Sequence, residues 1–174
     1  RVLFRSALAH LHAHWWNHPH LEQYVGSFPT RSTIEKYIAP AREGLAPFLA
    51  EMQNELTSEE KALILRVFDK HEGLMCRRAE AQESLTCIHG DPNPGNVLVP
   101  REPNGRAYLI DRQPFDWSLV VWTGASDLAY MMVHWWETER RRSLEKPLLE
   151  RYHQQLVARD RKSTRLNSSH SSVS

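Results

Sequence analysis

The chain has 174 residues, with 22 Lys and Arg against 21 Asp and Glu and a formal net charge of +1. This length is enough for one domain with a buried core, and the near-neutral charge gives no argument for nucleic acid or an anionic membrane as a partner. No apolar run approaches a membrane span, and two cysteines do not make a disulfide framework. We therefore expect a protein of the reducing cytoplasm.

The first half of the chain reads as helical. Residues 7–17 form the first predicted helix, and residues 19–29 read as irregular. A second helical stretch covers residues 30–56, where Pro40 and Pro47 must interrupt or kink it.

A capping box opens the next predicted helix, because Thr57 is followed three residues later by Glu60. The apolar positions of this helix are Leu63, Ile64, Val67, Phe68 and Met75. The sequence therefore predicts a long amphipathic helix that begins at the capping box.

The second half combines short strands with helices. A predicted strand over residues 85–88 leads into a loop, and a hairpin follows with strands over 97–99 and 107–110. Two helices are expected after it, over 127–142 and 144–158. The pattern predicts an α+β fold, mainly helical, with a small inserted hairpin.

The loop after the first strand carries the sequence His-Gly-Asp-Pro-Asn-Pro-Gly-Asn, residues 89–96. Phosphoryl transfer needs a carboxylate that receives a hydroxyl proton and oxygen ligands that hold Mg²⁺ on the phosphates. We interpret Asp91 as the base, and Asn96 and Asp111 as the metal ligands. The hairpin brings Asp111 back beside Asn96, so that one cation could bridge both. The alternative is that Asp91 and Asn96 are only turn residues.

These motifs resemble those of the aminoglycoside phosphotransferase and choline-kinase-like family, the small-molecule branch of the protein-kinase-like fold. The resemblance covers about residues 7–156. That family has a His-Gly-Asp catalytic loop with Asn five residues after the Asp, and an Ile-Asp-Trp-Gln metal motif, matched here by residues 110–113 with Arg112 in place of Trp. A third match is Asp127, near the start of a helix. From the residues alone, Asp127 with Ser126 could also cap that helix.

The resemblance implies a role for each matched residue. Asp91 would be the catalytic base, and His89 would orient the loop through hydrogen bonds. Asn96 and Asp111 would bind the nucleotide through Mg²⁺, and Asp127 would brace the catalytic loop without touching substrate. The cofactors implied are ATP and Mg²⁺, and the partners are a nucleotide and a small-molecule hydroxyl substrate.

The same family has an N-terminal lobe whose glycine-rich loop and strand lysine hold the nucleotide, and neither feature occurs in this sequence. We therefore expect the mainly helical C-terminal lobe of an ATP-dependent small-molecule phosphotransferase, without the N-terminal lobe and inactive by itself. The alternative is a catalytically inactive kinase-like binding or regulatory module, in which the Arg112 cation competes with Mg²⁺. The sequence fixes neither the substrate nor the oligomeric state.

The two ends of the chain have an unusual relation. One DNA sequence read in opposite orientations can encode both residues 1–6 and residues 160–165, and it looks like a sequencing adapter. A natural Ser-rich tail would fit the composition but not this mirror relation. We expect residues 1–6 to be an adapter-derived scar, 7–159 a partial kinase-like domain, and 160–174 a disordered tail of adapter origin.

Several other side chains could contact a ligand. His10 and His14 share a helix face at a spacing that could bind a metal, but no third ligand is fixed, and imidazoles on a helix surface are common. The resembled family often has a Leu-His-Ala-like stretch with aromatics here, matched by residues 11–13 with Trp15 and Trp16, and this implies a packing role. Candidate substrate contacts, which could suit an organic cation or a flat ring, follow the metal motif: Asp116, Trp117 and Trp122. Core packing for the tryptophans and a solvated turn for Asp116 are the alternatives.

Overall fold

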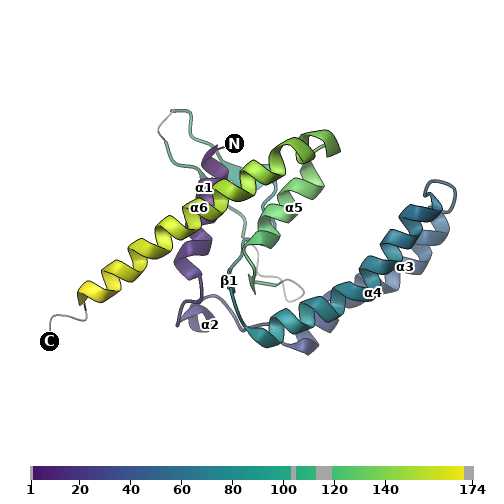
Figure 1. The fold of residues 1–174 in the computed structure, drawn as a ribbon, viewed down its shortest axis with the longest axis horizontal. Helices are drawn as coiled ribbons and strands as arrows, with labels where there is room; N and C mark the ends of the chain where they lie inside the picture. Colours follow the sequence, from purple (N-terminus) through teal and green to yellow (C-terminus); the bar gives the residue numbers. More distant parts are fainter. Residues whose placement is uncertain (1, 103–104, 113–118, 171–174) are drawn as a thin grey trace. The chain divides into compact units, whose positions relative to one another are not determined.

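The computed structural model describes residues 2–102, 105–112 and 119–170, with side chains described within 7–159. The described residues form six α-helices and two small sheets, which confirms the mainly helical prediction (Figure 1). The chain divides into two compact units. The first contains Arg1–Ser27, Ser84–Phe115 and Leu119–Ser174, and the second consists mainly of Phe28–Glu83. Within the described residues, no helix is long and apolar enough to cross a membrane.

Three helices build the core of the first unit: α1 (Val2–Trp15), α5 (Ala125–Trp135) and α6 (Thr138–His170). Helix α1 packs along α6, and α5 also contacts α6 (Figure 1). Burial of apolar side chains between these helices is the main force that holds the unit together. The buried members of this core are Leu8, Ala9, Leu128, Met131, Met132, Tyr152 and Leu156.

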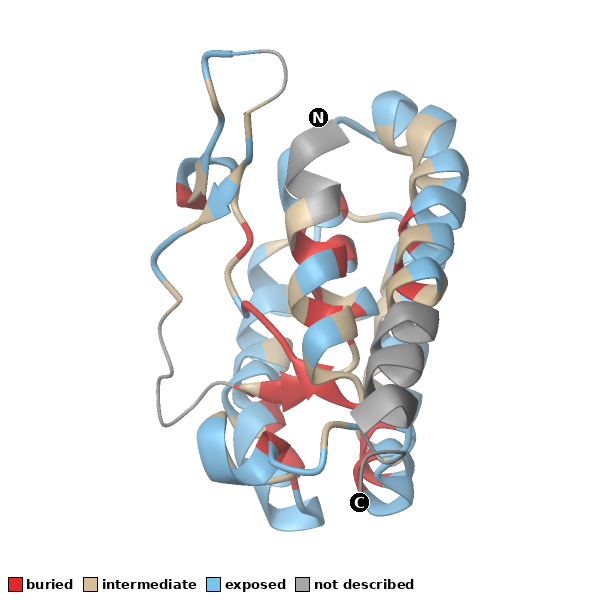
Figure 2. Ribbon diagram, turned by 90° about the vertical axis from the view of Figure 1, so that its left-hand side faces the viewer, coloured by how far each residue is buried: buried red, intermediate tan, exposed pale blue. Residues whose placement is uncertain are grey.

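Two antiparallel sheets of two strands each lie beside these helices. Strand β1 (Thr86–Cys87) pairs with β4 (Val121–Trp122), and all four of their residues are buried (Figure 2). Strand β2 (Val97–Leu98) pairs with β3 (Tyr108–Leu109), which confirms the predicted hairpin. The pairing of β1 with β4 was not predicted.

The boundary between the last two helices was predicted wrongly. Helix α5 ends at Trp135, because Trp136 adopts an extended backbone with φ −118° and ψ 133°. Helix α6 then begins at Thr138 and remains helical to His170, whereas we expected a disordered tail from residue 160. No Pro or Gly occurs between residues 160 and 170, and several residues there are good helix formers. The adapter origin of this segment stays a prediction.

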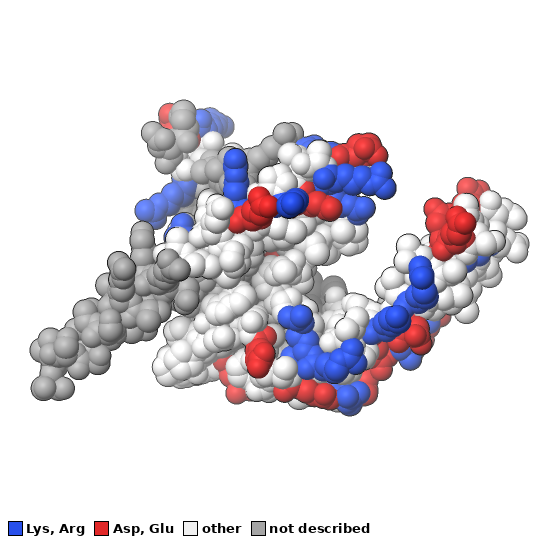
Figure 3. Space-filling model, in the orientation of Figure 1, with Lys and Arg blue, Asp and Glu red and all other residues white. Residues whose placement is uncertain are grey.

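The second unit is a pair of helices, α3 (Arg31–Glu51) and α4 (Ser58–Ala81), which pack along each other. Helix α3 continues through both of its prolines, so of the two predicted outcomes, an interruption or a kink, the interruption does not occur. The predicted capping box of α4 is confirmed: the Thr57 hydroxyl accepts from the Glu60 N–H, and the Glu60 carboxylate accepts from the Thr57 N–H. Figure 3 shows both signs of charge interspersed over this helix pair. The short helix α2 (Leu21–Tyr24) belongs to the first unit.

Candidate active site

A turn of 3-10 helix, Pro94–Asn96, shapes the loop between β1 and β2. The Asn93 side-chain oxygen accepts from the Gly95 N–H at 2.8 Å, and the Asn93 carbonyl accepts from the Asn96 N–H at 3.1 Å. Prolines at positions 92 and 94 prevent the β1 strand from continuing. The local sequence therefore forces the chain to turn back toward the hairpin.

Two amide side chains hold the Asp91 carboxylate within this turn. The Asn93 amide nitrogen lies 3.0 Å from each carboxylate oxygen, and the Asn96 amide nitrogen lies 3.1 Å from Oδ2. The Asn96 amide also donates to the Asp91 carbonyl at 2.9 Å. Asp91 itself is only part-buried. The carboxylate is thus oriented by donors and still accessible. Asn93 was not predicted as a functional residue.

A tyrosine from α5 also reaches Asp91. Burial raises the pKa of the Tyr130 hydroxyl, and so does its hydrogen bond with the Asp91 carboxylate. The Tyr130 ring packs against His134 one turn further along, with centroids 4.5 Å apart. Sequence reasoning missed Tyr130; its signal is that it follows Asp127 by three residues, which places both on one face of α5.

The hairpin register brings Asp111 close to the loop. The Ile110 N–H donates to the Asn96 carbonyl at 3.0 Å, and Val97 pairs with Leu109. Asp111 follows directly and has a left-handed backbone, with φ +58°. The Asn96 amide nitrogen donates to Asp91, so the oxygen of the same amide takes no part in that bond. Asn96 and Asp111 therefore supply an amide oxygen and a carboxylate from neighbouring positions of one hairpin.

The His89 ring joins the loop to the end of β3. Its Nε2 lies 2.9 Å from the Ile110 carbonyl, so this nitrogen carries the proton and donates. Its Nδ1 then accepts from the Asp91 N–H at 3.3 Å. Both ring nitrogens are engaged, and the residue is buried. These partners assign the neutral tautomer and favour an orienting role over that of a base.

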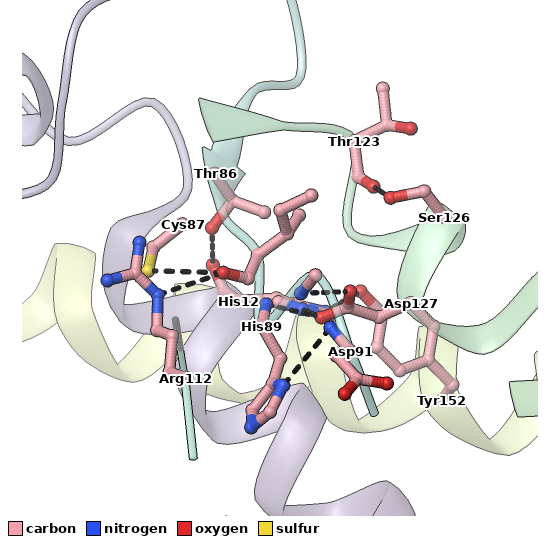
Figure 4. A network of polar contacts seen from close by, with 12 residues as sticks. His12, Thr86, Cys87, His89, Asp91, Arg112, Thr123, Ser126, Asp127 and Tyr152 are labelled. Atoms are coloured by element: carbon pink, nitrogen blue, oxygen red, sulfur yellow. Dashed lines mark hydrogen bonds and ion pairs between the residues drawn. The ribbon is translucent and has the colours of Figure 1, made fainter. Parts of the chain in front are cut away.

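Asp127 lies under the loop, buried in the first turn of α5 (Figure 4). Its Oδ2 accepts from the His89 N–H at 2.7 Å, and its Oδ1 accepts from the Gly90 N–H at 3.0 Å. Gly90 has φ +86°, a conformation that glycine adopts without strain. Asp127 does not cap its helix: the N-cap is Gly124, and Ser126 donates instead to the Thr123 carbonyl. The Asp127 carboxylate instead accepts from two backbone N–H groups of the loop.

Arg112, which replaces the tryptophan of the family motif, points to β1. Its Nε donates to the Ile88 carbonyl at 3.0 Å, beside the Cys87 thiol (Figure 4). Burial raises the pKa of Cys87, and the Arg112 cation partly opposes that rise. One guanidinium nitrogen, Nη2, is buried with no hydrogen-bond partner among the described residues. Arg112 thus ties the segment that carries Asp111 to the strand that leads into the loop.

The other candidate residues occupy different places. Trp122 lies in β4 and is 7% exposed, with Thr86 opposite it. Gln113, Asp116 and Trp117 lie outside the described residues. His14 stacks on His18 with ring centroids 5.8 Å apart. Within the described part of the chain, no group of three or more His, Cys, Asp or Glu side chains could hold a metal ion.

Comparison with known proteins gave one clear result. The sequence model of the ecdysteroid kinase-like family matches residues 5–164, which is most of the chain. Searches of the curated proteins and of the solved structures found no significant match. A match of this extent shows the family. The chain belongs to the ecdysteroid kinase-like family, a member of the aminoglycoside phosphotransferase and choline-kinase-like group of small-molecule kinases.

Proposed function

We propose that this chain carries the catalytic loop of an ATP-dependent phosphotransferase that acts on a hydroxyl group of a small molecule. The observation that carries the proposal is the Asp91 carboxylate, which two amide side chains orient and which stays accessible. Membership of a kinase family supports the use of ATP. The family's name refers to ecdysteroids. The same base could accept the proton of a hydroxyl group on any small molecule of this kind.

Asp91 would accept the proton of the acceptor hydroxyl. The hydroxyl oxygen forms a bond to the γ-phosphorus of ATP, the bond from that phosphorus to the β–γ bridging oxygen breaks, and ADP leaves. Asn93 and Asn96 keep the carboxylate in one orientation, so that little reorganisation is needed during the reaction. His89 would hold the loop against the end of β3, since both its ring nitrogens are occupied.

Asn96 and Asp111 would hold Mg²⁺. An amide oxygen and a carboxylate suit this cation, which usually takes one or two protein oxygens and completes its shell with phosphate and water. Bound there, Mg²⁺ would neutralise phosphate charge. The Nε of Arg112 is not directed at the Mg²⁺ ligands, because it donates to the Ile88 carbonyl.

The decisive experiment is a phosphate-transfer assay on the full-length protein that carries this chain, with ATP and a panel of hydroxyl acceptors. The Asp91→Asn variant should lower the transfer rate by about 100- to 10,000-fold, the usual contribution of a general base. Its thermal midpoint should stay close to that of the unchanged protein. The control is Glu102→Gln, which alters an exposed carboxylate in the same hairpin.

Near-normal turnover in Asp91→Asn would refute the role of Asp91. A second measurement follows the metal: Asp111→Asn should require a higher Mg²⁺ concentration for half-maximal transfer, and it should also weaken the binding of Mn²⁺ detected by electron paramagnetic resonance. If the full-length protein binds neither ATP nor Mn²⁺, the inactive kinase-like module becomes the better reading.

A further inference from the structure

A buried chain of hydrogen bonds connects three helices beneath the catalytic loop. The His12 ring on α1 lies 3.1 Å through Nε2 from Asp127 Oδ2 and 2.7 Å through Nδ1 from the Tyr152 hydroxyl on α6 (Figure 4). All three side chains are buried, and His12 is completely so. Neither His12 nor Tyr152 was predicted as a functional residue.

The Asp127 carboxylate fixes one proton of this network. A carboxylate can only accept, so His12 Nε2 carries a proton and donates to Asp127. In the neutral ring, Nδ1 then accepts from the Tyr152 hydroxyl. Burial raises the pKa of Tyr152, and the Asp127 charge raises it further, so Tyr152 remains a hydroxyl donor. His12 donates to Asp127, and with a neutral ring the donation runs from Tyr152 through His12 to Asp127.

The Asp127 carboxylate divides its two oxygens between the network and the loop. Oδ1 accepts from the Gly90 N–H, while Oδ2 accepts from both the His89 N–H and His12. His12 therefore limits rotation of the carboxylate plane, and that plane sets the direction of the two loop N–H groups. Asp91 directly follows Gly90, and its own N–H donates to the His89 ring.

Two neighbouring residues hold the His12 ring in place. The Thr86 hydroxyl donates to the His12 backbone carbonyl at 2.8 Å, which joins α1 to β1. Gly124 leaves room on the other side: a Cβ there would lie 2.5 Å from His12 Nδ1 and 2.6 Å from the Tyr152 hydroxyl oxygen. The start of α5 is thus shaped around this one hydrogen bond.

A polar network at this depth is costly unless every member is satisfied, and apolar side chains would fill the same space at less cost. Packing alone therefore gives no reason for an imidazole and a phenol here. We propose that His12 and Tyr152 are positioning residues, which act through Asp127 to hold the His89–Asp91 segment in its catalytic orientation. The inference rests on the proposed function, since Asp91 is taken as the base.

The test uses Tyr152→Phe in the full-length protein, because this change keeps the ring and removes only the hydroxyl. Hydrogen exchange measured by NMR should show faster exchange of the His89 and Gly90 amides. The transfer assay should show a kcat that falls by about five- to tenfold, the factor that one hydrogen bond supplies, with an unchanged KM for ATP. Normal amide exchange together with a normal kcat would overturn the proposal.

The matched control is Leu156→Ala, one turn along α6 in the same core, which destabilises the protein without touching the network. At a temperature well below unfolding it should leave both readouts unchanged. If it alters kcat and the two amides as Tyr152→Phe does, the role of Tyr152 is only structural, and the proposal fails.

Substitutions of His12 provide a rescue test. Gln keeps an N–H that can reach Asp127, whereas Leu keeps only the bulk, so His12→Gln should retain more of kcat than His12→Leu. Equal losses in the two variants would contradict the proposal. Failure of the proposed function is recognised separately, because it would appear as normal turnover in Asp91→Asn, while the amide-exchange readout needs no turnover.

Discussion

Two carboxylate contacts, one in each unit, differ in burial more than in geometry. His12 and Asp127 lie 3.1 Å apart with side chains 0% and 2% exposed. Arg31 and Glu80 lie closer, at 2.7 Å, but their side chains are 56% and 50% exposed. Water solvates and screens the second pair, whereas it does not reach the first. The shorter contact is therefore expected to matter less.

The difference indicates where the molecule depends on polar groups. In the first unit, Asp127 satisfies backbone donors of the candidate catalytic loop, so that its loss leaves buried groups unpaired. In the second unit, the ion pairs of α3 and α4 lie on the surface, and either partner can turn to water. The same buried side chains therefore stabilise the fold of the site and support its proposed chemistry. The surface charges of the helix pair in the second unit have no such double role.

Removal of the buried carboxylate should have the largest effect. Asp127→Ala leaves the His89 N–H and the His12 imidazole N–H without their acceptor, and we expect the free energy of unfolding to fall by about 2–5 kcal/mol. Urea denaturation followed by circular dichroism measures this loss, with Glu80→Ala as the exposed counterpart. A loss in Asp127→Ala no greater than that in Glu80→Ala would mean that burial does not distinguish the two contacts.

Filling the space beside the network should have the next largest effect. Gly124 has an ordinary φ of −59°, so its Ala variant suffers only from the close contacts with His12 and Tyr152, and overpacking of this kind costs about 1–3 kcal/mol. Gly44 in α3 is the matched control, since a Cβ there meets nothing within 4 Å. Gly44→Ala should raise stability by about 0.5–1 kcal/mol. The same sign for both variants in urea denaturation would contradict the expected difference.

Local patterns explain what the sequence predicted correctly. The turn residues of the loop and the two short apolar runs around residues 101–106 specify a hairpin, and that hairpin places Asp111 beside Asn96 without help from the rest of the chain. The capping box of α4 is local in the same sense, because Thr57 and Glu60 are three residues apart.

The features that the sequence did not predict depend on distant contacts. His12 and Asp127 are 115 residues apart, and His12 and Tyr152 are 140 apart, so no spacing rule connects them. The pairing of β1 with β4 is equally non-local. The end of α5 was missed for a different reason: no Pro or Gly marks the extended residue Trp136, and the charged residues that follow continue a helical pattern.

Alkaline conditions offer a finer test of the buried network. The folded protein holds the pKa of Tyr152 above its ordinary value of 10.0, so the unfolded chain releases this proton first. Above about pH 10 the unfolded state binds fewer protons, and stability falls by about 1.4 kcal/mol per pH unit for one such group. Tyr152→Phe lacks this proton and should lose less stability between about pH 9 and about pH 11. Parallel losses in the two proteins would show that Tyr152 ionises equally in both states.

The exposed pair of the second unit should give the smallest effect. The hydrogen bond with Glu80 and the charge of that carboxylate raise the pKa of Arg31. Both side chains are more than a third exposed, however, so solvent screening leaves the pair with little effect on the stability of the fold. Arg31→Gln, Glu80→Gln and the double variant should therefore share the thermal midpoint of the unchanged protein, at low salt as well as high. A double-mutant cycle isolates the pair from the loss of either side chain alone. If the cycle gave a coupling as large as the loss in Asp127→Ala, contact distance would decide the strength of these pairs, because the exposed pair is the shorter of the two.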